Sequence, residues 1–165
     1  MNEKTYISID NGATGAIGII SPGLSPELIP TPTFKEQNYT KKKGNITRID
    51  TIKIEEILKP YVEKQCFLFV ERPLVNPGRF KATISAVRAL EATLIIIEKL
   101  KLPYQYVDSK QWQKAMLPLG LKGPELKSAS KDIAIRLFPH LKEVIIKQKD
   151  GDAILMAEYC RREKL

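Results

Sequence analysis

The sequence predicts an α/β fold whose sheet has mixed strand directions. Residues 6–9 and 16–20 are short apolar segments separated by a Gly-rich turn, which is typical of an antiparallel hairpin. Residues 66–71 form a continuous apolar run, as expected of a strand buried on both faces. Residues 80–100 carry the longest helical pattern of the chain. Strands that alternate with helices in this way indicate an α/β layer.

The segments between these elements are shorter and more polar. Residues 21–49 are rich in Pro, Thr, Lys and Asn and predict only one edge strand, near residues 28–34. Helical spacing covers residues 50–64, where Pro60 should kink or end the helix because proline has no N–H to donate. Residues 104–107 are predicted to form another short strand.

Helices are predicted to complete the chain after this strand. Ser109 is expected to cap a helix that carries Trp112, a side chain that we expect in the packed core. Pro124 lies near the first position of a second helix, which should stop before Pro139. The last helix begins close to Asp150. At 165 residues the chain is long enough to bury a core, so we expect one domain spanning residues 1–165.

The charge of the chain predicts a polyanionic partner. The net charge is +8 and the isoelectric point is about 9.4, and Lys and Arg that neutralise phosphates release counterions. The excess is concentrated in residues 110–149, with a second cluster at Lys41, Lys42, Lys43 and Arg48. A Lys-rich solvated surface would also account for this charge, so charge alone leaves nucleic-acid binding open.

Targeting and cysteine patterns predict an intracellular protein. Cys66 and Cys160 show no metal-binding spacing, so we expect two reduced thiols and no zinc. The N-terminus has no signal-peptide pattern, and the apolar runs are too short to cross a bilayer. We therefore expect a soluble cytoplasmic protein with no membrane partner.

Four acidic residues lie at the edges of predicted apolar elements. Asp10 closes the first strand, Glu71 ends a later strand, and Asp150 and Asp152 begin the last helix. Burying an unpaired carboxylate costs several kcal/mol, roughly, unless a cation or donor meets it. If these ends converge, they form a Mg²⁺ site, and two ions about 3.5–4 Å apart are the usual arrangement for phosphodiester cleavage.

Each acid also has a purely structural interpretation. Asp10 could be a turn residue, and Glu71 could pair with the adjacent Arg72. Asp150 or Asp152 could cap the final helix and stabilise its dipole. These alternatives remain open for each acid taken singly.

Five segments follow one another along the chain: YISIDNGATGAIGII, CFLFVERP, VDSKQWQK, LKSASKDIAIRLFP and KDGDAILMAEYCRR. In this order they resemble successive motifs of the RuvC-type Holliday junction resolvases, and most closely the phage and organellar members of that group within the RNase H-like superfamily. The resemblance implies an RNase H-like three-layer fold, with a mixed five-stranded sheet flanked by helices. It also implies a homodimer that nicks four-way DNA junctions symmetrically with two Mg²⁺ ions per site, or Mn²⁺ in their place. Such a protein would be associated with the nucleoid, or lie in the host cytoplasm if a phage encodes it.

The same resemblance assigns residues to the site. Asp10 matches the first-strand Asp, Glu71 the strand-end Glu, and Asp152 the Asp of the final helix. The chain departs from the family at the fourth acid, which many relatives place three or four residues before the last Asp. Here Asp150 precedes Asp152 by two residues and position 149 is Lys, so Asp150 should lie in the turn that leads into the helix.

Basic residues are the candidates for DNA contacts. Lys114 and Lys127 align with family lysines near the scissile phosphate, where they could stabilise developing charge, hold the backbone or simply face solvent. The remaining candidates are Lys110 and Lys131 in the basic stretch, and Arg79, Phe80 and Lys81 in the loop after Glu71. Phe80 could wedge or stack at the branch point, although we favour packing on its own helix.

The helix over residues 84–100 has apolar residues on more than one face, as in the run from Leu94 to Ile97. A second contact surface is therefore expected, and in the resembled family this helix lies near the dimer interface.

Three other functions compete with junction resolution. The turn after Asp10 resembles the first phosphate loop of sugar kinases, actin and chaperone ATPases, but 165 residues leave no room for the second lobe that those proteins need. The same nuclease site could act on flaps, other branched DNA or RNA–DNA hybrids. The chain could also be a non-catalytic basic DNA-binding module, in which the acids are caps and turns.

Overall fold

A central sheet organises the molecule. The computed structural model describes residues 4–38, 41 and 44–165. Its five-stranded sheet has the order β3-β2-β1-β6-β7. The strands are β1 (Thr5–Asp10), β2 (Ala16–Ile20), β3 (Glu27–Pro30), β6 (Cys66–Glu71) and β7 (Tyr104–Val107). β1 runs antiparallel to β2 and parallel to β6, so the sheet is mixed, as predicted.

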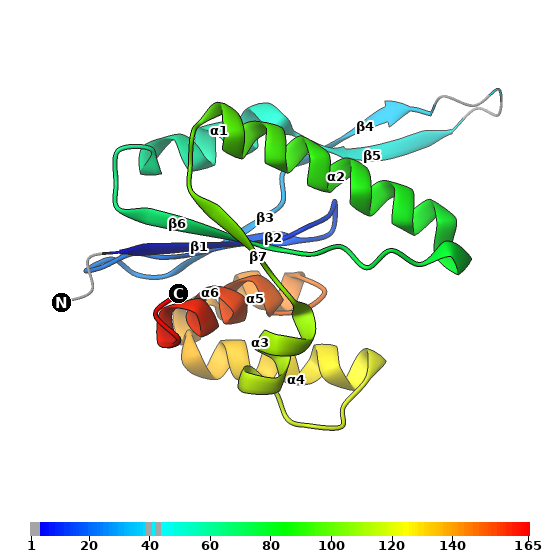
Figure 1. Ribbon diagram of the computed structural model, residues 1–165. Coiled ribbons are helices and arrows are strands. Elements are labelled where there is room, and N and C mark those ends of the chain that lie inside the picture. Colours follow the sequence, from blue (N-terminus) through cyan, green and yellow to red (C-terminus); the bar gives the residue numbers. More distant parts are fainter. Residues whose placement is uncertain (1–3, 39–40, 42–43) are drawn as a thin grey trace.

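Helices cover both faces of this sheet and make a three-layer fold (Figure 1). One face carries α1 (Thr51–Leu58) and α2 (Phe80–Lys99). The other carries α3 (Ser109–Met116), α4 (Gly123–Leu137), α5 (Lys142–Lys147) and α6 (Asp152–Arg162). A hydrophobic cluster fills each of the two interfaces between sheet and helices.

The sequence predictions differ from the structure mainly in the polar stretch before α1. That stretch forms β3 and a separate two-stranded sheet, β4 (Thr33–Gln37) with β5 (Asn45–Ile49), rather than one edge strand. Most residues of β4 and β5 are exposed, so no apolar alternation marks these two strands. Lys42 and Lys43 of the basic cluster lie outside the described residues.

The structure confirms that the first helix ends near Pro60 and corrects the predicted cap of the helix that carries Trp112. Asp50 caps α1 by accepting a hydrogen bond from the Lys53 N–H at 3.2 Å, and Pro60 lies in the 3₁₀ turn that ends this helix. The residue at the cap of α3 is Asp108 rather than Ser109. Cys66 and Cys160 are buried and free. No helix within the described ranges is long and apolar enough to cross a membrane.

Two small residues let α6 approach the sheet closely. Ser8 and Gly18 lie opposite each other on β1 and β2. The buried Ser8 hydroxyl donates to the Ala153 carbonyl at 2.5 Å. A Cβ at Gly18 would come within 2.7 Å of the same carbonyl oxygen, closer than side chains pack. The first turn of α6, and Asp152 with it, is therefore held against the first two strands.

The turn after Asp10 also requires glycine. Gly12 has φ +141°, and the Gly15 N–H donates to the Gly12 carbonyl at 3.0 Å. A Cβ at Gly15 would overlap the Asp10 carbonyl oxygen at 1.9 Å. The chain therefore reverses directly after Asp10 and leaves this carboxylate at the end of β1.

Candidate active site

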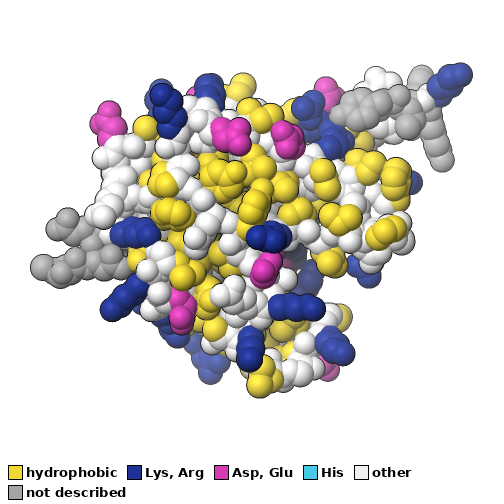
Figure 2. Space-filling model, in the orientation of Figure 1, with side chains coloured by type: hydrophobic (Ala, Val, Ile, Leu, Met, Phe, Trp, Pro, Cys, Tyr) yellow, Lys and Arg dark blue, Asp and Glu magenta, His cyan; other side chains and the backbone are white. Residues whose placement is uncertain are grey.

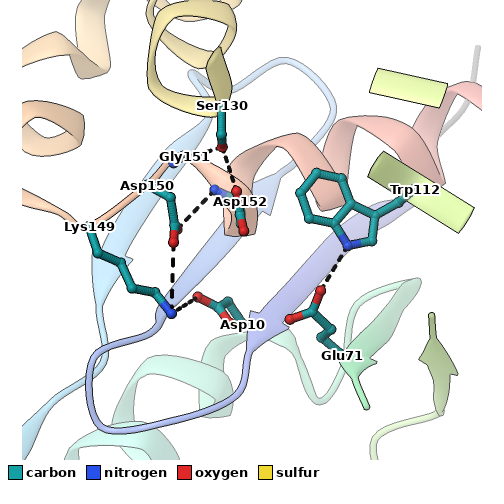
Figure 3. A network of polar contacts seen from close by, with 8 residues as sticks. All are labelled: Asp10, Glu71, Trp112, Ser130, Lys149, Asp150, Gly151 and Asp152. Atoms are coloured by element: carbon teal, nitrogen blue, oxygen red, sulfur yellow. Dashed lines mark hydrogen bonds and ion pairs between the residues drawn. The ribbon is translucent and has the colours of Figure 1, made fainter. Parts of the chain in front are cut away.

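The four acids singled out in the sequence meet at one edge of the sheet. β1 and β6 are parallel neighbours with Ile9 paired to Val70, so the next residue of each strand, Asp10 and Glu71, lies at the same strand end. Asp150 precedes α6 in the turn leading into it, as predicted, and Asp152 is its first residue. Figure 3 shows the four carboxylates turned toward a common space.

A lysine that the sequence reasoning did not place in the site lies among these acids. Lys149 Nζ is 3.1 Å from Asp10 Oδ2 and 3.8 Å from Asp150 Oδ2 (Figure 3). The available signal was the position of Lys149 directly beside Asp150, where relatives in the resembled family place an acid. A lysine next to an acidic motif also occurs on ordinary surfaces, so sequence adjacency did not distinguish the two cases.

Two buried donors orient the carboxylates. Trp112 is fully buried, and its Nε1–H donates to Glu71 Oε1 at 2.9 Å. Ser130, also fully buried, donates to Asp152 Oδ1 at 2.5 Å and accepts the Gly151 N–H at 3.0 Å. Trp112 is thus in the core, as predicted, and in addition fixes a site carboxylate. Periodicity alone does not reveal either hydrogen bond.

The structural interpretations of the acids fit less well. Arg72 lies 3.6 Å from Asp108, while Glu71 is engaged by Trp112. The cap residue of α6 is Gly151, which makes no side-chain cap. Asp150 Oδ1 accepts the Asp152 N–H at 3.3 Å, so Asp150 does stabilise the start of α6 with one of its oxygens.

Burial and mutual repulsion shift the protonation of the cluster. Burial, then repulsion from Asp10, raises the pKa of Glu71 to about 7. Burial, then repulsion from Asp150, raises the pKa of Asp152 to about 7. Burial also raises the pKa of Asp10, although the Lys149 charge opposes this. Burial lowers the pKa of Lys149, but attraction to Asp10 and Asp150 outweighs it and leaves this pKa above its ordinary value.

Replacing Trp112 by Phe should separate its packing role from its hydrogen bond. The variant keeps a buried ring but loses the N–H that lowers the pKa of Glu71, so this pKa should rise above about 7. The free energy of unfolding should fall by about 1–3 kcal/mol, since a buried acceptor loses its donor and the core loses volume. Carboxyl NMR titration and urea unfolding measure the two effects. An unchanged Glu71 titration would contradict this role of Trp112.

The chemistry of the cluster fits a hard divalent cation. Asp10, Glu71 and Asp152 offer carboxylate oxygens, which Mg²⁺ prefers, and a bound cation would offset the burial and mutual repulsion that raise their pKa values. Within the described part of the chain, no three His, Cys, Asp or Glu side chains form a group ready to hold a metal ion. Mg²⁺ usually takes one or two carboxylates and completes its shell with water and substrate phosphate. The site therefore suits an ion that shares its ligands with a phosphate.

A cavity of about 290 Å³ lies beside the carboxylates. Asp10 and Glu71 line it together with Lys149, Arg72 and Arg79. Positive side chains therefore border the space that the acids face. This arrangement would hold a phosphate against the carboxylates while balancing their charge.

The structure places the candidate residues of the loop after Glu71 and corrects the predicted packing of Phe80. Arg79 lines the cavity, and Lys81 is exposed nearby at the start of α2. Phe80 is 69% exposed, so it does not pack on its own helix as we favoured. Phe80 is the first residue of α2, and the buried residues of this helix begin only at Ala89.

The remaining basic candidates lie on α3 and α4. Lys110, Lys114 and Lys127 are exposed, and none is among the residues that line the cavity. Lys131 is partly buried, and its Nζ donates to the Ile146 carbonyl at 3.2 Å. The structure thus brings Arg79 to the carboxylates and leaves these four lysines on the surrounding surface.

Comparisons with known proteins identify the fold. No family model matches the chain, and no curated protein matches it. Two solved structures from Thermus thermophilus are similar. RuvC in complex with a Holliday junction substrate aligns with a TM-score of 0.61 at 14% identity, over 98% of this chain and 93% of that chain. Another RuvC structure aligns with a TM-score of 0.55 at 16% identity, over 98% and 96%.

The chain has the fold of RuvC. This result confirms the predicted RNase H-like arrangement of a mixed five-stranded sheet between layers of helices. The likeness extends over 98% of this chain and 93% and 96% of the two RuvC chains.

Proposed function

We propose that this protein is a divalent-metal-dependent endonuclease that resolves four-way DNA junctions by paired nicks. The observation that carries the proposal is the convergence of Asp10, Glu71 and Asp152 beside a basic-lined cavity, on the fold of a protein solved with a Holliday junction substrate. The net charge of +8 supports a nucleic-acid partner. We further propose that residues 1–165 act as one nuclease domain.

In this proposal, some side chains hold the metal ion and others orient them. Asp10, Glu71 and Asp152 would hold Mg²⁺ or Mn²⁺, while Asp150 lies beside them with one oxygen facing Lys149. The ion, when bound, polarises the scissile phosphate and lowers the pKa of water, which supplies a nucleophile at neutral pH. Trp112 and Ser130 keep the carboxylates oriented through their hydrogen bonds.

Basic side chains supply the contacts to the DNA backbone. Arg79 lines the cavity beside the carboxylates, and the surrounding surface adds Lys81, Lys110, Lys114, Lys127 and Lys131. Exposed lysines of this kind bind phosphates without reading sequence, so junction affinity should fall steeply with salt. Phe80, exposed at the start of α2, is available to stack at the branch point.

A cleavage assay on synthetic four-way junctions, labelled on each strand in turn, tests the proposal. Mg²⁺ should give nicks at two symmetry-related positions, and EDTA should abolish them. Flap, duplex and RNA–DNA hybrid substrates serve as controls. Faster cleavage of flaps or hybrids would show that the preferred substrate is one of these and not the four-way junction. Salt-sensitive binding without cleavage of any substrate would instead make the protein a DNA-binding module.

Paired nicking requires two active sites, and α2 offers a surface for a second copy of the chain. Its buried side includes Ala89, Thr93, Ile96 and Ile97. Along its other side, Ile84, Val87 and Ile95 are exposed and lie on one helix face. Figure 2 shows hydrophobic side chains gathered over this region. We propose that this stripe is the homodimer interface.

Replacing Val87 by Glu should break the dimer. Val87 is 45% exposed, so a Glu is tolerated in the monomer, but burying its charge in an interface costs several kcal/mol, roughly. The dissociation constant should rise about 100-fold or more. Light scattering measures this, with Val62→Glu as the matched control because Val62 is 44% exposed and lies after the end of α1. A wild-type monomer on junction DNA would contradict the interface.

A further inference from the structure

Lys149 occupies a position that the proposed nuclease function does not explain. Its ammonium lies between two carboxylates of the cluster, with Nζ 3.1 Å from Asp10 Oδ2 and 3.8 Å from Asp150 Oδ2. The side chain is 34% exposed, against 7% for Asp10 and 6% for Asp150, so it enters the cluster from its solvent side. A surface ion pair would involve exposed acids, whereas these two are buried.

The backbone around Lys149 is held tightly in place. A Cβ at Gly151 would meet the Ala134 Cβ at 2.5 Å and the Ser130 carbonyl oxygen at 2.9 Å, so the turn before α6 packs directly on α4. The Ser130 hydroxyl accepts the Gly151 N–H at 3.0 Å. This packing fixes the backbone two residues after Lys149, and from this backbone the Lys149 side chain reaches Asp10.

Asp150 is already engaged by the protein through both oxygens. Its Oδ1 accepts the Asp152 N–H, and its Oδ2 faces the Lys149 ammonium. A divalent ion bridging Asp10 and Asp150 would bind each oxygen at about 2.0–2.1 Å. It could not lie between these oxygens while Nζ does, because the two cations would overlap and repel each other. On the other side of Asp10, Glu71 and Asp152 face the remaining space (Figure 3).

We propose that Lys149 is a built-in cation that takes the place of a second metal ion, so that this site binds one divalent ion and not the two expected from sequence. The ammonium neutralises Asp10 and Asp150, and the single ion binds on the side of Glu71 and Asp152. The proposal rests on the assignment of these acids as the metal site of the proposed nuclease. It specifies the cofactor requirement of that site.

Counting bound Mn²⁺ tests the proposal without measuring activity. The full-length protein, titrated by calorimetry and by the loss of the free-Mn²⁺ EPR signal, should bind one ion per chain. Lys149→Asp replaces the ammonium with a carboxylate three residues before Asp152 and should bind two. Lys149→Arg keeps a cation and should bind one. Lys147→Asp, at an exposed site at the end of α5, makes the same charge change and should also bind one.

Either of two results would overturn the proposal. Two ions bound by the wild type would mean that metal displaces Lys149. One ion bound by a folded Lys149→Asp, as checked by circular dichroism, would mean that Lys149 does not occupy a metal position. If Lys149→Asp fails to fold, the number of Mn²⁺ ions bound by the wild type and by Lys149→Arg still tests the proposal. Junction cleavage is measured in a separate assay. Cleavage by a protein that binds two ions would reject the role of Lys149 but keep the nuclease function. One bound ion without cleavage would reject the nuclease function but keep the role of Lys149.

Discussion

Asp10→Asn should abolish Mg²⁺-dependent junction cleavage and leave junction binding intact. Asp10 is the buried acid that faces Glu71 on one side and Lys149 on the other, so it is the carboxylate that a bound ion would share most closely with the rest of the site. A metal ion supplies several kcal/mol of transition-state stabilisation, and a loss of about 4 kcal/mol slows the reaction about a thousandfold. We expect at least this loss in the single-turnover rate.

The amide should cost little in folding. Burial already disfavours the Asp10 charge, and Asn is nearly the same size, so the free energy of unfolding in EDTA should change little or rise. Junction affinity, measured by gel shift over a salt series, should keep its slope because the basic surface is unchanged. Asp132→Asn removes an exposed acid on α4 and is the matched control. Undiminished cleavage by Asp10→Asn would reject the assigned site.

The strand ends could be predicted from sequence because local pattern determines them. Asp10 and Glu71 each follow an apolar run of strand length, and parallel pairing of those runs brings their ends together. The partners of these acids could not be predicted in the same way. Trp112 and Ser130 reach Glu71 and Asp152 from α3 and α4, over separations of 41 and 22 residues. Such contacts depend on how helices pack on the sheet, which periodicity does not specify.

The hairpin of β4 and β5 was missed for a different reason. Only Ile49 of its two strands is buried, so no continuous buried face imposes the alternation by which strands are recognised. Lys149 is a third case, because a lysine beside acids is normally a surface ion pair. Only the burial of Asp10 and Asp150 distinguishes this one.

Without metal, the protein should lose stability as the pH rises from 5 to 8. The folded state raises the pKa of Glu71 from 4.5 and that of Asp152 from 3.8, in each case to about 7. Between these values the unfolded chain has released protons that the folded protein still holds. Each such group lowers the free energy of unfolding by about 1.4 kcal/mol per pH unit in this window, and the effect levels off above the folded pKa.

The total effect should be on the order of 3 kcal/mol, since the groups repel one another and their contributions overlap. For a chain of 165 residues this corresponds to a midpoint of thermal unfolding about 6–12 °C lower at pH 8 than at pH 5. Calorimetry in EDTA at fixed protein concentration measures it. Asp152→Asn removes one of the two groups and should flatten the profile.

Mg²⁺ should counteract the loss of stability at high pH, because metal binding requires the deprotonated carboxylates that the metal-free fold disfavours. The rise in the unfolding midpoint on adding Mg²⁺ should therefore be larger at pH 8 than at pH 5. Lys149 keeps its charge throughout this range, since its pKa lies above the ordinary lysine value, so it does not contribute to the slope. A flat midpoint between pH 5 and 8 in EDTA would show that Glu71 and Asp152 ionise normally in the fold. The metal-free fold would then impose no energetic cost on the ionised carboxylates that a bound cation could relieve.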